Sequence, residues 1–272
     1  MSKVIGIDLG TTFSAIASLD DMGNPEVISS IDDNRKITAS AVYVNGNNVI
    51  VGDKALDYLV AEPKKVIVQT KREMENDMIY SISDGVWKKN DGTETEIYTP
   101  AQISAFILKK LKDYTSDVKR AVITVPAMFA ESARRATLDA AKLSNIEVIE
   151  LINEPTAAVL HYASLPGVEV GGRVMIYDLG GGTFDVTIAE VKNKKVDVIT
   201  SRGDKYLGGK DFDFEITKLM NKKYKEKFNV ELESENNKQY MKKAEDIKKI
   251  LSVKNKASVL IKGPKGELTI EI

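Results

Sequence analysis

Apolar and polar positions along the chain form one arrangement that occurs twice. An apolar run at residues 4–9 is followed by a short turn of small residues and a second apolar run at 13–19. The runs at 174–179 and 184–189 flank a similar turn that is rich in glycine. Short apolar runs rich in β-branched residues and separated by glycine turns are typical of β-hairpins. We therefore predict two hairpins, and each places an Asp-Leu-Gly sequence where its first strand ends.

The rest of the pattern alternates strands with helices, as in α/β proteins. Residues 37–98 are less regular and more polar, and we interpret them as a small inserted subdomain. The other expected elements are strands at 26–29, 41–44, 121–125, 146–150 and 196–200, helices at 131–143, 211–227 and 236–252, helices that begin at Thr99 and Asn153, and a hairpin within 257–272. The helix at 211–227 is expected to pack through its large apolar residues, which are Phe212, Ile216, Leu219 and Met220.

The composition mainly excludes certain kinds of partner and site. Lys and Arg total 39 and Asp and Glu total 40, so no net field recruits nucleic acid or an acidic membrane. The absence of cysteine excludes disulfides, thiolate-bound zinc and thiol catalysis, and it fits a reducing cytosol. A single histidine, His161, excludes a histidine metal site and a Ser-His-Asp triad. With no signal-peptide core and no apolar run of membrane-spanning length, we expect a cytoplasmic protein.

The two glycine turns indicate a phosphate clamp. Glycine lets backbone N–H groups converge on an anion without a Cβ in the way. Asp8 and Asp178 end the first strands, and an aspartate can assist there only if a cation stands between it and the phosphate. A Walker phosphate loop is absent, so we expect the two aspartates to hold Mg²⁺ through its waters. On the alternative interpretation, the two aspartates only cap the turns.

Five short segments are distinctive beyond their hydrophobic pattern. They are Ile-Gly-Ile-Asp-Leu-Gly-Thr-Thr at 5–12, Val-Pro-Ala-Met-Phe at 125–129, Asn-Glu-Pro-Thr-Ala-Ala at 153–158, Asp-Leu-Gly-Gly-Gly-Thr-Phe-Asp-Val at 178–186 and Gly-Gly-Lys-Asp-Phe-Asp at 208–213. In this order and spacing they resemble the N-terminal ATPase domain of the seventy-kilodalton heat-shock chaperones, the DnaK-like family. The doubled hairpin is shared with actin and sugar kinases, whereas the segment at 153–158 points to the chaperone branch.

The resemblance implies an α/β fold of the two-lobed, actin-like ATPase type with a ribonuclease H-like core motif. It predicts a first-lobe core at 1–36 and 99–167, an inserted outer subdomain at 37–98, the start of the second-lobe core at 168–207 and part of a second outer subdomain at 208–272. The family continues with further strands, a glycine-rich adenosine loop, a linker and a peptide-binding domain. We therefore expect the second lobe to be incomplete.

The resemblance also implies which residues act on a nucleotide. The expected catalytic residues are Lys71, Glu154, Asp178 and Thr183, and the expected metal-binding residues are Asp8 and Asp178. The residues expected to contact ATP or ADP are Gly10, Thr11, Thr12, Phe13, Lys71, Gly180, Gly181, Gly182, Thr183, Gly209, Glu245, Lys248, Lys249 and Ser252. In the family, the lysine reaches the γ-phosphate and the attacking water, and the glutamate positions water and metal. Pro126 and Arg134 match positions that couple the nucleotide state to the peptide-binding domain.

Several of these assignments depend on the resemblance alone. Lys71 by itself is one surface lysine among many, and residues 73–76 depart from the family's usual continuation. Taken by itself, Glu154 is an acidic residue at the start of a helix, where its carboxylate would only interact with the positive end of the helix dipole. The four predicted adenosine contacts in the last helix share one stripe, which would otherwise be a solvated charged face. Lys249 stands where the family commonly has arginine, and lysine has no planar guanidinium to stack on adenine.

We interpret the chain as the ATP-binding and ATP-hydrolysing domain of a heat-shock-type chaperone. In the full-length parent its partners would be unfolded client peptides, a J-domain co-chaperone and a nucleotide-exchange factor. Because the second lobe is expected to be incomplete, we expect weak nucleotide binding. The alternatives are a sugar or small-molecule kinase, which would transfer phosphate to an acceptor, and an actin-like protein, which would form filaments with ATP.

Overall fold

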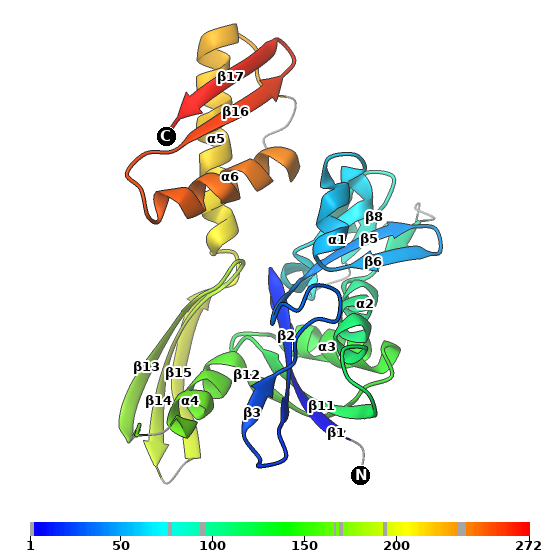
Figure 1. Ribbon diagram of the computed structural model, residues 1–272, viewed down its shortest axis with the longest axis vertical. Coiled ribbons are helices and arrows are strands. Elements are labelled where there is room, and N and C mark those ends of the chain that lie inside the picture. The colour runs from blue at the N-terminus through cyan, green and yellow to red at the C-terminus, as the bar shows by residue number, and fades with distance from the viewer. Residues whose placement is uncertain are drawn as a thin grey trace. The chain divides into compact units, whose positions relative to one another are not determined.

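A computed structural model of the chain (Figure 1) describes residues 3–75, 78–92, 96–165, 167–168, 171–192, 195–232 and 238–272. The chain folds as two compact units, Met1–Lys205 and Tyr206–Ile272. The first unit contains both predicted glycine hairpins. The finer subdomain boundaries that we expect within it stay predictions.

The first unit is built around a mixed sheet in the order β12-β11-β1-β2-β3, with β4 paired to β2. Its strands are β1 (Lys3–Asp8), β2 (Phe13–Leu19), β3 (Pro25–Val27), β4 (Thr38–Ala39), β11 (Val118–Val125) and β12 (Glu147–Asn153). Strands β1 and β2 form the first predicted hairpin, whereas β1, β11 and β12 run parallel. Because parallel strands end at the same edge of a sheet, Asp8, Thr124 and Asn153 lie at neighbouring strand ends.

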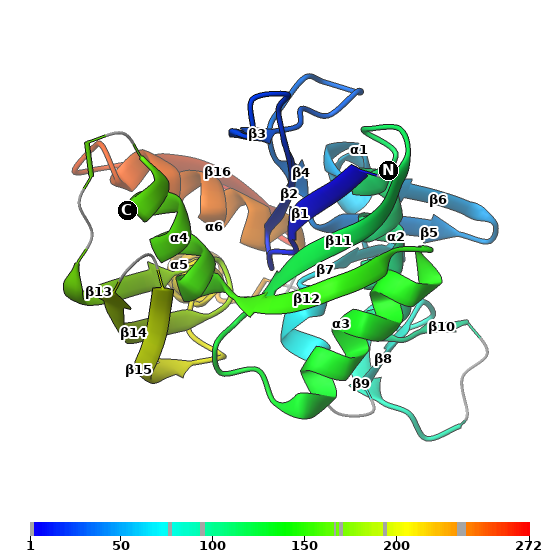
Figure 2. The same cartoon turned by 90° about the horizontal axis from the view of Figure 1, so that it is seen from below.

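Helices α2 (Pro100–Lys112) and α3 (Glu131–Leu143) pack against each other beside this sheet (Figure 2). Helix α2 begins as predicted after Thr99, whose hydroxyl accepts a hydrogen bond from the Gln102 N–H at 3.2 Å. The Gln102 side chain in turn accepts one from the Thr99 N–H at 2.8 Å. This capping box pairs amides that the first helical turn leaves without partners. The fully buried apolar residues between helices and sheet include Ile5, Ile7, Ile16, Ile103, Leu108, Leu111 and Ile123.

The inserted region consists of short strands and helical turns. These are β5 (Ala41–Asn45), β6 (Asn48–Val51), α1 (Asp53–Leu56), η1 (Asp57–Leu59), η2 (Pro63–Lys65), β7 (Val66–Val68), η3 (Thr70–Glu73), β8 (Met78–Ser81), β9 (Val86–Lys89) and β10 (Ile97–Tyr98). Strand β5 pairs with β6 and β7, and β8 pairs with β9 and β10. Trp87 lies edge-on against Tyr80, with ring centroids 5.4 Å apart. The turn η3 carries Lys71 and follows Gln69, which adopts a left-handed φ of 66°.

The second predicted hairpin lies in an antiparallel sheet in the order β13-β14-β15. Its strands are β13 (Gly172–Leu179), β14 (Phe184–Lys192) and β15 (Lys195–Asp204). The hairpin closes with Leu179 opposite Phe184, so the glycine turn lies between these two residues. Helix α4 (Glu154–Ser164) follows β12 directly and has Pro155 in its first turn, where a missing N–H costs nothing. No helix among the described residues has both the length and the apolar character needed to cross a membrane.

The second unit consists of α5 (Gly209–Phe228), α6 (Lys238–Leu251), β16 (Ser258–Gly263) and β17 (Gly266–Glu271), and the last two form the predicted final hairpin. Its core contains Met220, Tyr224, Tyr240, Ala244, Ile247 and Ile261.

The packing face that we predict for α5 is wrong in its first turn. Phe212 is 46% exposed, whereas the adjacent Asp213 is buried. The buried face continues through Thr217, Met220, Asn221 and Tyr224. The physical reason is that the polar residues on this face have partners inside the unit, because Asp213 pairs with a lysine of α6 and Asn221 accepts the Leu232 N–H at 2.7 Å.

Candidate functional site

The tips of the two glycine hairpins lie against each other in the first unit. A Cβ added to Gly181 would lie 2.0 Å from Thr12 Oγ1, and one added to Gly182 would lie 2.5 Å from Thr11 Cγ2. No real Cβ tolerates such distances, so the two tips approach this closely only because the second tip has no side chains. The structure therefore brings together the two predicted phosphate loops, which lie far apart in the sequence.

The first tip is fixed by hydrogen bonds to serine side chains. The Gly10 N–H donates to Ser14 Oγ at 3.2 Å, and Ser40 Oγ donates to Gly10 O at 2.7 Å. The Ser40 N–H donates to Thr12 O at 2.8 Å. A Cβ at Gly10 would lie 2.0 Å from Phe13 O, so only glycine allows this turn. The backbone of residues 10–13 is thus held in one shape before any ligand binds.

The second tip leaves donors available. The Gly180 N–H donates to Thr183 O at 2.9 Å and closes the turn. The N–H groups of Gly181 and Gly182 donate to no other residue in the part of the chain that the structure describes. Successive unpaired N–H groups in a turn form a concavity that attracts anions. Among the predicted phosphate contacts at 180–183, the N–H groups of Gly181 and Gly182 are therefore available to an anion.

Lys71 and Glu154 form an ion pair beside the hairpins. Their side chains are 9% and 16% exposed, so both charges are largely removed from water. The next residue, Arg72, donates from Nε to Gly182 O at 2.8 Å and ties the turn η3 to the tip of the second hairpin. Removing two charges from water is unfavourable unless they are paired with each other. The pairing therefore holds the two side chains in a fixed geometry.

The electrostatics place both hairpin aspartates near this ion pair. Burial raises the pKa of Glu154, the Lys71 ammonium opposes the shift, and Asp8 and Asp178 add to it. Burial also raises the pKa of Asp178, Lys71 again opposes the shift, and Asp8 adds to it. Asp8 accepts a hydrogen bond from Thr124 Oγ1 at 2.8 Å, which orients its carboxylate. The carboxylates that interact here thus outnumber the Lys71 ammonium, and negative charge is left in excess.

This set of groups fits a hydrated divalent cation. Carboxylate oxygens are the ligands that Mg²⁺ prefers, and Mg²⁺ usually keeps several of its waters. No group of three His, Asp or Glu side chains in the described ranges is close enough to ligate a metal directly. Asp8 and Asp178 could contact such an ion through its waters.

Asp185 is a candidate residue that the sequence reasoning missed. It lies directly opposite Asp178 across the hairpin, and it is 5% exposed. Its Oδ1 has no hydrogen-bond partner among the described residues. Burial raises its pKa, and the nearby Asp178 carboxylate adds to the shift. An acidic residue at an inward position of an alternating strand is the sequence signal that could have identified it.

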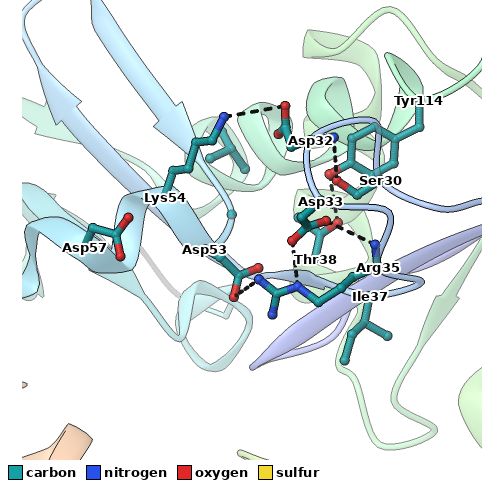
Figure 3. Close-up of a pocket in the computed structure, with 12 residues that line it drawn as sticks. Ser30, Asp32, Asp33, Arg35, Ile37, Thr38, Asp53, Lys54, Asp57 and Tyr114 are labelled. Atoms are coloured by element: carbon teal, nitrogen blue, oxygen red, sulfur yellow. Dashed lines mark hydrogen bonds and ion pairs between the residues drawn. The ribbon is translucent and has the colours of Figure 1, made fainter.

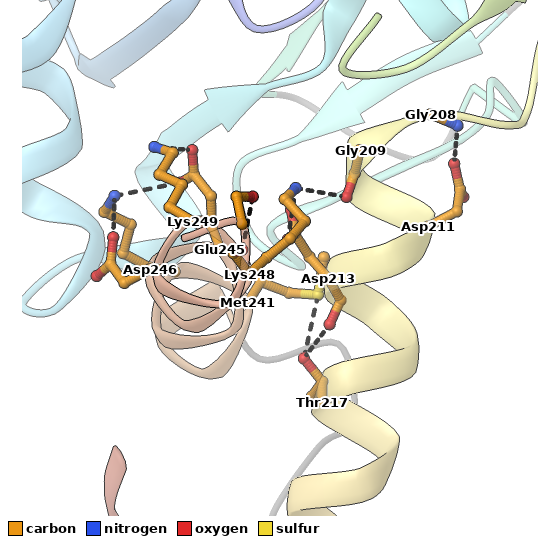
Figure 4. Close-up of polar contacts among 12 residues, drawn as sticks. Gly208, Gly209, Asp211, Asp213, Thr217, Met241, Glu245, Asp246, Lys248 and Lys249 are labelled. Atoms are coloured by element: carbon orange, nitrogen blue, oxygen red, sulfur yellow. Dashed lines mark hydrogen bonds and ion pairs between the residues drawn. The ribbon is translucent and has the colours of Figure 1, made fainter. Parts of the chain in front are cut away.

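The predicted adenosine residues lie in the second unit (Figure 4). Gly209 is the first residue of α5, and Lys248 Nζ donates to its carbonyl oxygen at 2.7 Å. Glu245 and Lys249 pair with each other along α6 at 2.6 Å. Ser252 follows the last residue of α6, and its Oγ donates to Lys248 O at 3.2 Å. These five residues form one polar patch of the second unit.

The residues predicted to transmit the nucleotide state lie near Glu154. Arg134 donates from Nη2 to Asn153 Oδ1 at 2.7 Å and from Nε to Phe129 O at 3.3 Å. Asn153 is the N-cap of α4 and directly precedes Glu154. Pro126 follows β11 and accepts the Phe129 N–H at 3.1 Å. Arg134 thus connects α3 to the start of the helix that carries Glu154.

A separate pocket of about 270 Å³ lies between residues 30–38, the start of α1 and Tyr114 (Figure 3). Its charged groups pair with each other, since Arg35 contacts both Asp33 at 2.6 Å and Asp53 at 3.1 Å. Asp32 pairs with the lysine at position 110. None of the predicted nucleotide residues lines this pocket, and most of its charged side chains are in ion pairs.

Comparison with known proteins gives consistent matches along the chain. The family model described as "Hsp70 protein" matches residues 4–263. The "Chaperone protein DnaK" of Thermotoga petrophila is 38% identical over 237 residues, which cover 84% of this chain and 37% of that protein. The "Mitochondrial-type heat shock protein 70" of Encephalitozoon cuniculi is 37% identical over 275 residues, which cover 93% of this chain and 45% of that protein. The chain thus spans less than half the length of these relatives.

Proposed function

This chain belongs to the Hsp70 family, and on that basis we propose that it binds ATP or ADP with Mg²⁺ and hydrolyses ATP. The observation that carries the proposal is the contact between the two glycine tips beside the charged side chains of Asp8, Lys71, Glu154 and Asp178. Phosphoryl transfer to water depends mainly on positioning and on neutralising the charge of the transferred group. This arrangement offers both backbone donors and opposite charges at one place.

Each hairpin has its own role in the proposal. Asp8 and Asp178 hold the metal through its waters, and Mg²⁺, when bound, neutralises the phosphate oxygens. The backbone N–H groups of Gly181 and Gly182 and those of Thr11 and Thr12 bind the phosphates, assisted by the hydroxyls of Thr11, Thr12 and Thr183. The serine contacts of Gly10 fix the backbone of the first tip in advance, so little ordering is needed when the phosphates bind.

Lys71 and Glu154 are proposed as the pair that acts on the attacking water. The ammonium of Lys71 can stabilise negative charge that develops on the transferred phosphoryl group. Glu154 accepts a hydrogen bond from the water and orients it. Because its pKa is raised by burial, this carboxylate is also more basic than an exposed glutamate.

The proposal extends to the longer proteins that this chain resembles. In a full-length parent, ATP turnover would control the binding of unfolded client peptides, with a J-domain co-chaperone and a nucleotide-exchange factor as partners. We assign Gly209, Glu245, Lys248, Lys249 and Ser252 to the adenosine. We also assign the protein to the cytoplasm, because the chain has no cysteine and bacterial DnaK proteins are among its relatives.

Calorimetric titration with ATP, with and without Mg²⁺, tests the proposal. We expect Mg²⁺-dependent binding, which Asp8→Ala or Asp178→Ala should abolish. At 100 times the dissociation constant, Mg·ATP should stabilise the fold by about 2.7 kcal/mol in a thermal melt of the unsubstituted chain. Unchanged binding by both variants would refute the two-sided clamp.

The same purified chain can be tested for the kinase and filament alternatives, which the comparisons do not favour. A sugar kinase would consume ATP only after a sugar is added, and an actin-like protein would sediment with ATP. We expect release of inorganic phosphate without added sugar and no sedimentable polymer. The exposed Asp246 provides a matched control, because Asp246→Asn removes a carboxylate that is remote from the hairpin tips in sequence. This variant should leave Mg·ATP binding, phosphate release and sedimentation unchanged.

A further inference from the structure

A buried ion pair joins the two helices of the second unit (Figure 4). Lys248 Nζ on α6 lies 2.7 Å from Asp213 Oδ1 on α5. The same nitrogen donates a hydrogen bond to Gly209 O, at the first residue of α5. The Asp213 side chain is 7% exposed and that of Lys248 is 29% exposed. The lysine therefore extends from the surface of α6 to a carboxylate that lies inside the unit.

Burial of this pair is not by itself evidence of a net gain in stability. Burial raises the pKa of Asp213, and the ammonium of Lys248 opposes the shift only in part. Asp213 Oδ1 lies 2.7 Å from Lys248 Nζ, and it has no other polar partner within the described residues. An apolar pair of similar volume often stabilises a helix interface as well or better. What the ion pair provides is a fixed position for the ammonium.

The position of Lys248 differs from that of Lys242 and Lys249 on the same helix. Lys249 pairs with Glu245 along the surface and is 57% exposed, and Lys242 pairs with Asp246 and is 46% exposed. Such exposed pairs hold a long side chain only loosely. Lys248 is anchored at two points on the neighbouring helix. An ammonium has three donors, so one N–H remains for a ligand after Asp213 and Gly209 O are satisfied.

We propose that Asp213 is a positioning residue for the nucleoside part of a bound nucleotide. It holds Lys248 Nζ and the first turn of α5 in one arrangement, and the remaining N–H of Lys248 donates to a ribose hydroxyl or a base nitrogen. The inference rests on the proposed function, in which Gly209 and Lys248 contact the adenosine. Asp213 itself does not touch the nucleotide and acts only through Lys248.

The physical effect is preorganisation. A free lysine side chain samples many rotamers, and a ligand that uses it must restrict them at a cost in binding free energy. Asp213 imposes that restriction when the unit folds. Without it, the ammonium returns to solvent and the ligand contact becomes less frequent. We expect the loss to be about tenfold in affinity, as for one charge-assisted contact.

Asp213→Asn in the full chain tests the inference, because it keeps the side-chain shape and removes the charge. Calorimetry with Mg·ATP should show about tenfold weaker binding. Competition of Mg·tripolyphosphate with Mg·ATP should give an unchanged tripolyphosphate affinity, because tripolyphosphate has no nucleoside. Asp246→Asn is the matched control, since this carboxylate also pairs with a lysine of α6 but is 55% exposed. It should change neither affinity.

A double-mutant cycle separates a positioning role from a structural one. Lys248→Met should weaken Mg·ATP binding, and adding Asp213→Asn should weaken it no further. The double variant contains no buried charge at this interface. The double variant can therefore replace a single variant that fails to fold, and its loss of affinity should again be confined to Mg·ATP.

Three results would overturn the inference. The first is Mg·ATP binding by Asp213→Asn that equals that of the unsubstituted chain, which leaves the proposed function intact. The second is an equal loss of Mg·ATP and tripolyphosphate affinity, because a general structural defect would then explain the effect. The third is an absence of Mg·ATP binding by the unsubstituted chain, which would refute the proposed function as well.

Discussion

Charged side chains from four different elements influence one another at the hairpin tips. Asp8 ends β1, Lys71 lies on η3, Glu154 begins α4 and Asp178 lies near the end of β13. The pKa of Glu154 depends on all three of the others, after burial. The carboxylates at this site outnumber the cationic side chains, so a cation that enters lowers the excess of negative charge. Binding of a metal and binding of phosphate should therefore reinforce each other here.

Replacement of Lys71 by alanine tests the division of roles within this group. Lys71→Ala should lower the single-turnover rate of ATP hydrolysis by roughly a hundredfold, because a preorganised charge on the transition state is lost. Affinity for Mg·ATP should change by only a few fold, since the metal and the backbone donors remain. Parallel measurement of rate and affinity gives both values.

The control for this variant is Lys119→Ala, which removes an exposed lysine on β11. It should alter neither the rate nor the affinity. If Lys71→Ala lowered both quantities equally, or neither of them, Lys71 would be a structural or a surface residue.

At this scale the repeated hairpin motif is what singles out Asp8 and Asp178 in the sequence, and their roles stay predictions. The contact between Lys71 and Glu154 joins residues that are 83 positions apart, and no local spacing encodes it. Asp185 and Asp213 escaped notice because a buried acid looks like a surface acid until its neighbours are known.

At the scale of elements, the glycine tips determine how closely the hairpins approach. The first tip is held by serine hydroxyls, and the second has backbone donors with no side chain above them. A Cβ at position 181 or 182 would lie where the Thr12 or Thr11 side chain now lies, so the tips or these side chains would have to move. Steric room, and not an unusual φ, is what these two glycines provide.

Gly181→Ala should therefore separate the tips. Its Cβ would meet Thr12 Oγ1 at 2.0 Å, so the hairpins or the threonine must move. We expect about tenfold weaker Mg·ATP binding and a decrease of about 1 kcal/mol in the free energy of unfolding, as for a modest overpacked contact. Calorimetry and urea denaturation measure the two effects.

Gly171→Ala is the matched control, because an added Cβ there meets no atom within 4 Å and the backbone has no positive φ. It should leave the affinity unchanged. A Gly181→Ala variant that behaved like this control would show that the close approach of the tips has no bearing on binding.

Elements with a strong local signal are predicted correctly. Helix α3 spans 131–143 as expected. Thr99 is the N-cap of α2, and Pro100 lies in its first turn, also as expected. The packing face of α5 is wrong in its first turn because hydrophobic periodicity cannot detect a buried ion pair. Partners of this kind lie on another helix, so they follow from the tertiary structure and not from the local pattern.

At the scale of the whole molecule, membership of the Hsp70 family confirms the predicted α/β class and the actin-like ATPase fold. The chain nevertheless consists of two compact units with separate apolar cores. The core of the first unit surrounds β1, β11 and α2, whereas that of the second lies between α5, α6 and the final hairpin. Separate cores need not lose their structure under the same conditions.

We expect the two units to unfold in different ranges of urea concentration. The chain has a single tryptophan, Trp87, which packs in the first unit, so its fluorescence reports that unit alone. Far-ultraviolet circular dichroism reports the helices of both units. The two unfolding curves should therefore have different midpoints.

Trp87→Phe serves as the control, because it should remove the fluorescence change and leave a biphasic circular dichroism curve. Coincident curves from both probes would mean that the two units unfold as one cooperative body.

The pairing of β1 with β11 has a consequence for synthesis on the ribosome. Lys3 is registered with Val118, so the inner edge of β1 stays without its partner until the intervening chain has been translated. At about 5–20 residues per second, that delay lasts on the order of ten seconds. During this time Ile5 and Ile7, which are buried in the finished fold, lack β11 as a neighbour. The nascent chain therefore exposes an apolar strand early in its synthesis, and shielding that strand until β11 is made would keep it from associating with other chains.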